Sequence, residues 1–308
     1  MSNASESKQR AARQLDAFAE MVVSVARAAG VRSVICVTET GKVFKAVEKR
    51  ANGLRVIAAT PSKATYDSLE EGSFEVVKLP VRVSNRFKQA QHALSIALRA
   101  KKVSAGELTL CAIGQGIPGA KGDFLILMDV EDGTSHAPLH DLVKLKDDIC
   151  PAVLDAVLEI ACKIGRSARR GNRLGAIFAI GDSERVLEGS RQLVLNPFQG
   201  HPRETRMVTN PATRSMLAEL SKLDGAFVLR GDGFIQTAGV YLSAGSESVN
   251  LSQGLGARHM TAAAVTARTC ATAVVVSATD GLVRVFSQGD LVMRIDPDVP
   301  EDWLDFDN

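Results

Sequence analysis

The chain has 308 residues, of which 45% are hydrophobic and 23% charged, and 37 basic side chains stand against 35 acidic ones. This composition excludes a disordered chain, and the glycine, proline and cysteine contents exclude a collagen-like or disulfide-rich scaffold. The length suffices for about two domains, and neither residues 1–150 (21 basic, 17 acidic) nor residues 151–308 (16 basic, 18 acidic) are basic enough to indicate a nucleic-acid partner.

The first half alternates short β-branched runs with amphipathic stretches, which predicts strands and helices in turn. The predicted helices are 13–29, 42–51, 63–70 and 84–100, and the predicted strands are 33–37, 54–59, 75–79, 108–113 and 124–130. This alternation predicts a three-layer α/β domain with a mostly parallel sheet. Residues 131–148 combine charge with turn signals and are the predicted connection, so the expected domains are residues 1–148 and 149–308.

The second half begins with a predicted helix at 151–163, followed by a basic loop bounded by Gly165 and Gly171. A buried strand at 174–180, a short helix at 184–188 and a helix at 211–222 with Asn210 as its cap come next. Two hairpins complete the pattern, and the second leads into a last strand. This order predicts an α/β domain whose mixed, twisted sheet is flanked by helices.

No stretch of the sequence predicts a membrane-spanning helix. The longest uncharged segments, 234–246 and 269–279, are shorter than the roughly 18 residues that such a helix needs. The N-terminus lacks the apolar core of a secretory signal. We therefore expect a cytoplasmic protein with no membrane partner.

Three glycines with the spacing of a dinucleotide-binding loop, Gly114, Gly116 and Gly119, directly follow the predicted strand 108–113. A dinucleotide loop must open a helix whose N-terminal amides meet the pyrophosphate. Here the next segment is predicted to be a strand, which favours a loop between two strands over an NAD site. Lys121 and exposed amides in this loop could still hold an anion.

The segment from Gly254 onward places an arginine and a histidine at the start of a helix. Gly254 and Gly256 indicate a loop, and the alanine-rich run after Arg258 and His259 is a strong helix former. Free amides, the positive end of the helix dipole, an arginine and a histidine then converge, which describes a phosphate or triphosphate site. The alternative is that Arg258 is a surface charge and His259 a hydrogen-bonded core residue.

Asp224 and Gly225 lie between the end of a predicted helix and the start of a predicted strand. Asp-Gly is a common turn pair, so a plain turn is one interpretation. The other is that the Asp224 carboxylate, at the edge of a sheet, holds a divalent cation against phosphate oxygens or polarises a hydroxyl nucleophile.

The combination of these segments resembles the diadenylate cyclase domain. The signatures of that family are a DGA motif, here Asp224 to Ala226, and a GTRHR-like motif, here Gly256 to Met260. The segments NPFQGHPRETR, KLDGAF and GLGARH and the VVVS strand are similar to the archaeal-type members over about residues 151–295. In that group the cyclase domain follows a domain similar to the C-terminal domain of pyruvate kinase, and the first half with its GQGIPGAKGDFLIL segment fits that description.

The resemblance implies an enzyme, a nucleotidyltransferase that condenses two ATP into cyclic di-AMP and two pyrophosphates across a face-to-face homodimer or higher homo-oligomer. It implies catalytic roles for Asp224, Arg258 and His259, with Asp224 and His259 on a Mn²⁺ or Mg²⁺ ion. It further implies nucleotide contacts along the two motifs and at the end of the VVVS strand, at Gly225, Ala226, Gly256, Ala257, Arg258, His259 and Ser277.

Three positions depart from the family pattern. Ala257 and Met260 stand where the GTRHR-like motif has its threonine and second arginine, and Ala278 stands where the family has an acidic or amide side chain. These losses weaken charge neutralisation at the phosphates and remove a candidate metal or base contact. A nucleotide-binding sensor of the same fold without turnover is therefore the first alternative. A metabolic enzyme or effector-binding module centred on the glycine loop of the first half is the second.

Overall fold

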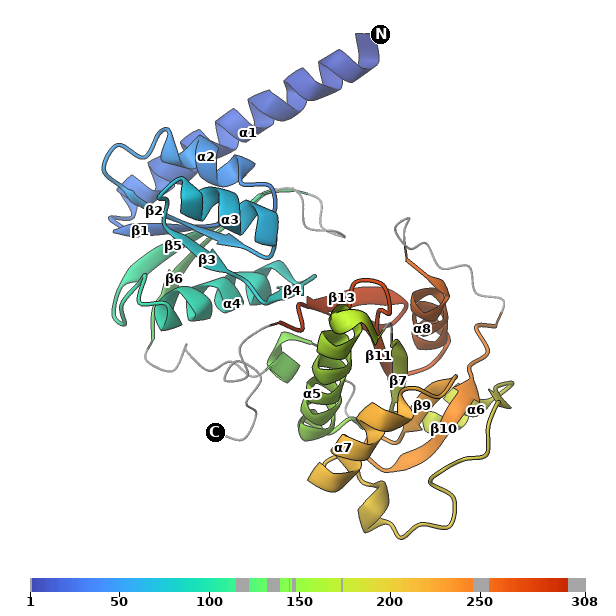
Figure 1. The fold of residues 1–308 in the computed structure, drawn as a ribbon. Helices are drawn as coiled ribbons and strands as arrows, with labels where there is room; N and C mark the ends of the chain where they lie inside the picture. The colour runs from blue at the N-terminus through green and yellow to red at the C-terminus, as the bar shows by residue number, and fades with distance from the viewer. Residues whose placement is uncertain are drawn as a thin grey trace. The chain divides into compact units, whose positions relative to one another are not determined.

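The computed structural model describes residues 2–114, 122–131, 139–143, 145, 148–172, 174–245 and 255–298. The chain folds into two compact units, Met1–Ala137 and Pro138–Asn308 (Figure 1). This division falls inside the predicted connection, and the expected domain boundary after residue 148 stays a prediction. None of the helices in the described part of the chain combines the length and the apolar character that crossing a bilayer requires.

The first unit is built on a five-stranded sheet in the order β3-β2-β1-β5-β6. Its strands are β1 (Ser33–Val37), β2 (Arg55–Thr60), β3 (Val76–Lys78), β5 (Leu108–Ile113) and β6 (Phe124–Asp129), and a short strand, β4 (Val81–Val83), follows β3 in the chain. Neighbouring strands are parallel except β6, which is antiparallel to β5. All five residues of β1 are buried, and the four after Ser33 are apolar, as is typical of a strand covered on both faces.

Helices cover both faces of this sheet, as Figure 1 shows. Val34 and Cys36 of β1 join a buried cluster with Phe18 and Phe44 from two of the helices. The helix α4 (Arg86–Arg99) packs against β1 and β5, and its buried residues lie outside this cluster. The predicted three-layer α/β arrangement with a mostly parallel sheet is therefore confirmed. In chain order the helices are α1 (Ser2–Ala28), α2 (Lys42–Glu48), α3 (Lys63–Glu71) and α4 (Arg86–Arg99), of which α1 and α2 hold Phe18 and Phe44 and α4 covers the other face.

Gly114, the first glycine of the motif, directly follows β5, and the next described strand of this unit is β6. β5 and β6 pair antiparallel, with Ile113 opposite Phe124. The predicted strands on both sides of the glycines are thus confirmed, and the loop between them stays a prediction. Lys121 lies with residues 115–121 outside the described residues.

The second unit is built on a mixed sheet in the order β13-β12-β11-β7-β9-β10-β8. β7 and β9 are parallel, and the other neighbours are antiparallel. Both predicted hairpins, β9–β10 and β11–β12, are present. The strands are β7 (Ala176–Ile180), β8 (Arg191–Gln192), β9 (Ala226–Leu229), β10 (Ile235–Tyr241), β11 (Thr272–Val276), β12 (Val283–Ser287) and β13 (Asp290–Ile295).

Two helices cover the central strands of this sheet and confirm the predicted α/β class. These two are α5 (Pro151–Ser167) and α8 (Ala257–Arg268). Besides the π-helical turn that follows α5, the other described helices of this unit are η2 (Leu139–Leu142), α6 (Ser183–Leu187), η4 (Glu204–Arg206) and α7 (Pro211–Leu220). Ile177 of β7 packs in a buried cluster with Val265 of α8. α5 also contacts β7, β11 and β12, but its buried residues lie outside that cluster, so α5 covers the other face. The predicted cap of α7 is confirmed, since the amide of Ala212 donates to Asn210 Oδ1 at 2.9 Å.

The prediction of a loop between Gly165 and Gly171 is wrong. α5 continues to Ser167 and passes into a π-helical turn, η3 (Ala168–Asn172). Gly165 is a point of close packing, because a Cβ at this position would overlap the carbonyl oxygen of Gly281. Gly171, with a φ of 102°, lies where the turn leaves helical geometry. The glycines that suggested a loop therefore serve close packing and helix termination.

Candidate active site

One end of the second sheet brings together segments that lie far apart in the sequence. Val276, the last residue of β11, pairs with Ala176, the first residue of β7. β9 runs parallel to β7, and its register carried back along both strands puts Gly225 beside Ala176. The DGA motif and Ser277 therefore lie at the same end of the sheet's strands, on either side of the first residue of β7.

Arg258 reaches this end of the strands from the first turn of α8, and its side chain is exposed. A Cβ on Gly175, just before β7, would lie 3.1 Å from Arg258 Nη1, 3.1 Å from the carbonyl oxygen of Val276 and 3.2 Å from the Cβ of Ala278. The guanidinium thus lies over the start of β7, beside the end of β11. Sequence reasoning missed Gly175, because a single glycine before a strand carries no signal of its own.

The first turn of α8 offers backbone amides to the same region. Gly256 is the cap residue, with extended backbone (φ −78°, ψ 177°) and no side-chain hydrogen bond. Gly256 and Ala257 are exposed, and the helix dipole adds positive potential at this end. The predicted helix start is confirmed, and the amides together with Arg258 suit an anionic group.

Asp224 is exposed and comes two residues before the first residue of β9. Gly225 between them fixes this geometry, since its φ is 107° and a Cβ there would lie 2.5 Å from the carbonyl carbon of Gly239 and 2.5 Å from Val240 N. Ala226, the first residue of β9, is buried. The Asp224 carboxylate is therefore held at the solvent end of the sheet, where it can meet a cation or a hydroxyl group.

His259 takes a different direction from Arg258, because successive helix residues differ by about 100° around the axis. Its side chain is 6% exposed, and Arg284 Nη1 of β12 donates to its Nε2 at 3.3 Å. Burial, together with the charge of Arg284, lowers the pKa of His259 to about 4. The ring is therefore neutral near pH 7, and its buried Nδ1 has no hydrogen-bond partner among the described residues.

A polar network that sequence reasoning missed links His259 to the loop between β11 and β12. Arg284 Nη2 donates to Asp280 Oδ2 at 2.8 Å. Burial raises the pKa of Asp280, but hydrogen bonds from Arg284, the Ser277 hydroxyl and the Leu282 amide outweigh this effect and hold the pKa at about 2. Ser277, a predicted nucleotide contact, is 8% exposed, and its hydroxyl is bound within its own loop.

The residues present fit a divalent cation only in part. The described residues contain no group of three or more His, Cys, Asp and Glu side chains that could hold a metal ion. Asp224 offers an exposed carboxylate, and Mg²⁺ is commonly held by one or two carboxylates plus substrate phosphates. The Nε2 atom of His259 faces the Arg284 guanidinium instead. The metal role of His259 stays a prediction, and it requires a different arrangement of Arg284.

The first unit has a cavity of its own, of about 180 Å³. It lies at the carboxyl ends of β1 and β5, and its lining includes Thr38, Glu39, Lys42, Arg82 and Gly114. Open α/β sheets commonly bind ligands at such an end. An effector-binding module, the second alternative, would hold its ligand here.

Comparison with known proteins divides the chain in the same way. Residues 163–291 match the model of the family described as DisA bacterial checkpoint controller nucleotide-binding, and residues 16–124 match that of the pyruvate kinase alpha/beta domain. A diadenylate cyclase of Methanocaldococcus jannaschii is 30% identical over 263 residues, which are 84% of this chain and 84% of the relative. A diadenylate cyclase of Haloferax volcanii is 36% identical over 235 residues, 76% of this chain and 84% of the relative.

Solved structures match one part of the chain each. DacA from Staphylococcus aureus is 22% identical with a TM-score of 0.34, over 48% of this chain and 92% of that chain. A pyruvate kinase from Cryptosporidium parvum is 17% identical with a TM-score of 0.32, over 38% of this chain and 23% of that chain.

Proposed function

The chain belongs to the diadenylate cyclase family and is a nucleotidyltransferase, and from this premise we propose that it condenses two ATP molecules into cyclic di-AMP and two pyrophosphates. In this reaction each 3′-hydroxyl attacks the α-phosphate of the other nucleotide. A protomer that holds one ATP cannot close the ring alone, so two protomers bring their nucleotides face to face. Such a transfer depends on in-line positioning and charge neutralisation rather than on covalent catalysis.

The observation that carries the proposal is the gathering of Arg258, the α8 N-terminus and Asp224 at one edge of the second sheet. Arg258 and the amides of Gly256 and Ala257 face the triphosphate, because a guanidinium and a helix N-terminus both favour negative charge. Gly225 and Ala226 are the proposed nucleotide contacts at the start of β9, where Gly225 is partly exposed and Ala226 is buried. Ser277 bounds the same edge at the end of β11.

Asp224 lies on the side of the 3′-hydroxyl and of the metal that accompanies ATP. Mn²⁺ or Mg²⁺, when bound there, would supply further neutralisation of phosphate charge. His259 enters as a neutral ring whose Nε2 accepts the hydrogen bond of Arg284. In this role His259 fixes Arg284, and through Arg284 it fixes the loop that carries Ser277.

The second candidate function is a sensor that binds nucleotide without turnover. All three departures from the family pattern lie at the site itself. Ala257 and Met260 are exposed in the first turn of α8. Ala278 lies beside Gly175, which the Arg258 guanidinium also approaches. Incubation of the pure protein with ATP and Mn²⁺, followed by mass analysis, separates the two functions. A cyclase yields cyclic di-AMP, whereas a sensor retains ATP without product.

A variant of Asp224 tests the site assignment. Asp224→Asn keeps the size of an exposed side chain and removes its charge, so we expect a folded protein whose rate of cyclic di-AMP formation falls on the order of 10²- to 10³-fold. Asp232→Asn is the matched control, because Asp232 is exposed in the turn at the opposite end of β9. An Asp224→Asn variant with the wild-type rate would overturn the assignment of Asp224.

The first unit provides the test against the second alternative. Under the proposed function a chain that lacks residues 1–148 still binds ATP, because the site lies in the second unit. Equilibrium binding of ATP to this shortened chain is the measurement. Loss of binding with the second unit still folded would favour an effector-binding module in the first unit.

A further inference from the structure

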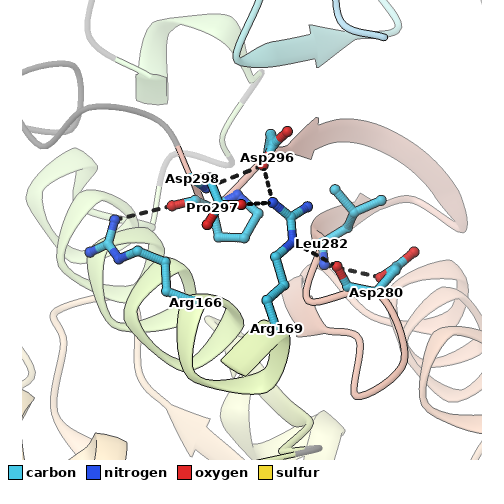
Figure 2. Close-up of polar contacts among 7 residues, drawn as sticks. All are labelled: Arg166, Arg169, Asp280, Leu282, Asp296, Pro297 and Asp298. Atoms are coloured by element: carbon cyan, nitrogen blue, oxygen red, sulfur yellow. Dashed lines mark hydrogen bonds and ion pairs between the residues drawn. The ribbon is translucent and has the colours of Figure 1, made fainter. Parts of the chain in front are cut away.

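The loop between β11 and β12, residues 277–282, is held from both faces of the second sheet. On the side of α8, Arg284 binds the Asp280 carboxylate. On the side of α5, Arg169 of η3 donates its Nε to the carbonyl oxygen of Asp280 at 2.9 Å (Figure 2). Asp280 is thus bound through its side chain by one arginine and through its backbone by another.

The guanidinium of Arg169 also binds the segment that follows β13. Its Nη1 lies 2.5 Å from Asp296 Oδ1 and pairs with the carboxylate of Asp298 as well. Arg166, one helical turn earlier, donates to the carbonyl oxygen of Pro297 at 3.1 Å, as Figure 2 shows. One side chain therefore joins three segments: η3, the β11–β12 loop and residues 296–298.

The loop rests directly on the backbone of α5. A Cβ on Gly281 would lie 2.5 Å from the carbonyl oxygen of Gly165, so the two glycines are in close contact. The same loop begins with Ser277 and Ala278, and the Cβ of Ala278 lies beside Gly175, which the Arg258 guanidinium also approaches. A shift of the loop on α5 would therefore move the wall of the candidate site.

We propose that Arg169, together with Asp296 and Asp298, is a clamp that positions the β11–β12 loop for the nucleotidyl transfer. The inference rests on the proposed function and adds a positioning residue to it. Arg169 acts through Asp280 and does not touch the nucleotide. An isolated surface ion pair contributes about 0–1 kcal/mol to stability, and such a pair would not explain why one guanidinium also holds the Asp280 carbonyl.

The test compares Arg169→Ala and Arg169→Lys with Arg214→Ala. Arg214 of α7 forms a similar ion pair with Glu159 of α5, away from the loop. We expect Arg169→Ala to lower kcat roughly 10- to 100-fold with a smaller change in KM, because displacements of about 1 Å can cost 10²-fold in rate. Lysine does not restore kcat, because an ammonium group cannot reproduce the planar fork that reaches both partners. Arg214→Ala keeps the wild-type kcat.

Two further measurements complete the test. The Asp296→Asn, Asp298→Asn double variant loses less activity than Arg169→Ala, and adding it to Arg169→Ala brings no further loss, because the three side chains act as a unit. Hydrogen exchange reports on the loop without activity: the amides of Ser277 and Gly281, bonded within the loop, exchange faster in Arg169→Ala but not in Arg214→Ala.

Each outcome decides one of the two proposals. If the loop amides of Arg169→Ala exchange at the wild-type rate, the clamp is overturned. It is also overturned if these amides exchange faster but the kcat of Arg169→Ala is as high as that of Arg214→Ala. If the wild-type protein forms no cyclic di-AMP, the proposed function fails, and the exchange comparison still shows whether Arg169 holds the loop.

Discussion

Gly225 has no reactive group, yet it decides where the Asp224 carboxylate stands. Its φ of 107° lies in the left-handed region, and the backbone of Gly239 and Val240 fills the space that a Cβ would need. Any side chain here would have to move β10 or β9. The DGA motif is thus a packing requirement as well as a chemical one, because the carboxylate keeps its place only if the strand after it can begin beside β10.

A glycine-to-alanine pair separates the two costs at this position. Gly225→Ala and Gly200→Ala both place a Cβ at positive φ, which costs about 1–2 kcal/mol in each case. Only Gly225→Ala also meets backbone atoms, since nothing lies within 4 Å of a Cβ at Gly200. We expect Gly225→Ala to lower the free energy of unfolding of the second unit by about 1–3 kcal/mol more than Gly200→Ala. Urea denaturation of both variants is the measurement, and equal losses would contradict the packing argument.

Residues with a chemical signature were the ones that the sequence could indicate. Asp224 and Arg258 stand in recognisable motifs, and the structure brings their segments to one edge of the sheet. Arg284 carries no such signature, because its alternation with valines in β12 is typical of a solvent-facing residue. It is 8% exposed because α8 covers that face, and no local pattern reports which helix packs on a strand.

At the scale of elements, the contact between α8 and β12 is made by a buried histidine next to a buried arginine. His259 and Arg284 lie 3.3 Å apart at Nε2 and Nη1, and Phe286 of the same strand lies beside the ring. Protonation of His259 would put two positive charges together in a buried contact. The negative charge of Asp280 offsets this repulsion only in part, because its carboxylate binds the guanidinium of Arg284 and raises the pKa of His259 less than Arg284 lowers it. The packing of α8 on β12 therefore depends on a neutral His259.

This dependence predicts a loss of stability in acid. In the unfolded chain His259 binds a proton below about pH 6.5, whereas in the folded chain it does so only below about pH 4. The unfolded state thus binds more protons in this window, and the free energy of unfolding of the second unit decreases as the pH falls from 6.5 to 4, by on the order of 1–3 kcal/mol. Hydrogen exchange of β11 peptides in urea at several pH values measures it.

Histidine variants provide the control for this prediction. His259→Gln removes the titrating group, so the stability of the second unit should vary less between pH 6.5 and 4. His92 of α4 also has a pKa lowered to about 4 by burial, but it lies in the first unit. His92→Gln should leave the second unit unchanged, and an equal effect of the two variants would contradict the assignment to His259.

Element prediction succeeded where burial and local pattern agree. β1 and β5 have their predicted bounds, because β-branched and apolar runs between turn signals form strands buried on both faces. The end of α5 was predicted as a loop, because glycine is a helix breaker in isolation. In the folded chain Gly165 gains close contact with Gly281, a tertiary effect that the sequence around Gly165 does not contain.

At the scale of the whole molecule, both parts of the chain have counterparts in the archaeal diadenylate cyclases, whose similarity extends over 76–84% of its length. The near-neutral total charge says little about the function of either part, because the ATP site proposed for the second unit depends on local positive potential at Arg258 and the N-terminus of α8. The proposed reaction adds a requirement beyond the single chain, since each ATP needs the 3′-hydroxyl of another.

The rate of cyclic di-AMP formation should therefore depend on protein concentration. Two protomers must face each other, so at saturating ATP the specific activity falls on dilution once the dimers dissociate, and it is constant where they are fully formed. Activity measured across a dilution series, with sedimentation under the same conditions, relates the rate to the dimer fraction. A constant specific activity in a range where sedimentation finds only monomers would contradict the face-to-face requirement.

Mixing experiments sharpen the same prediction, because they keep the total protein concentration fixed. Asp224→Asn protomers added in excess to wild-type protein should lower the activity per wild-type protomer, since most wild-type sites then face a site that cannot complete its own bond. Asp232→Asn protomers, whose substitution lies at the other end of β9, should leave that activity unchanged. If each protomer acted alone, neither addition would lower the activity per wild-type protomer.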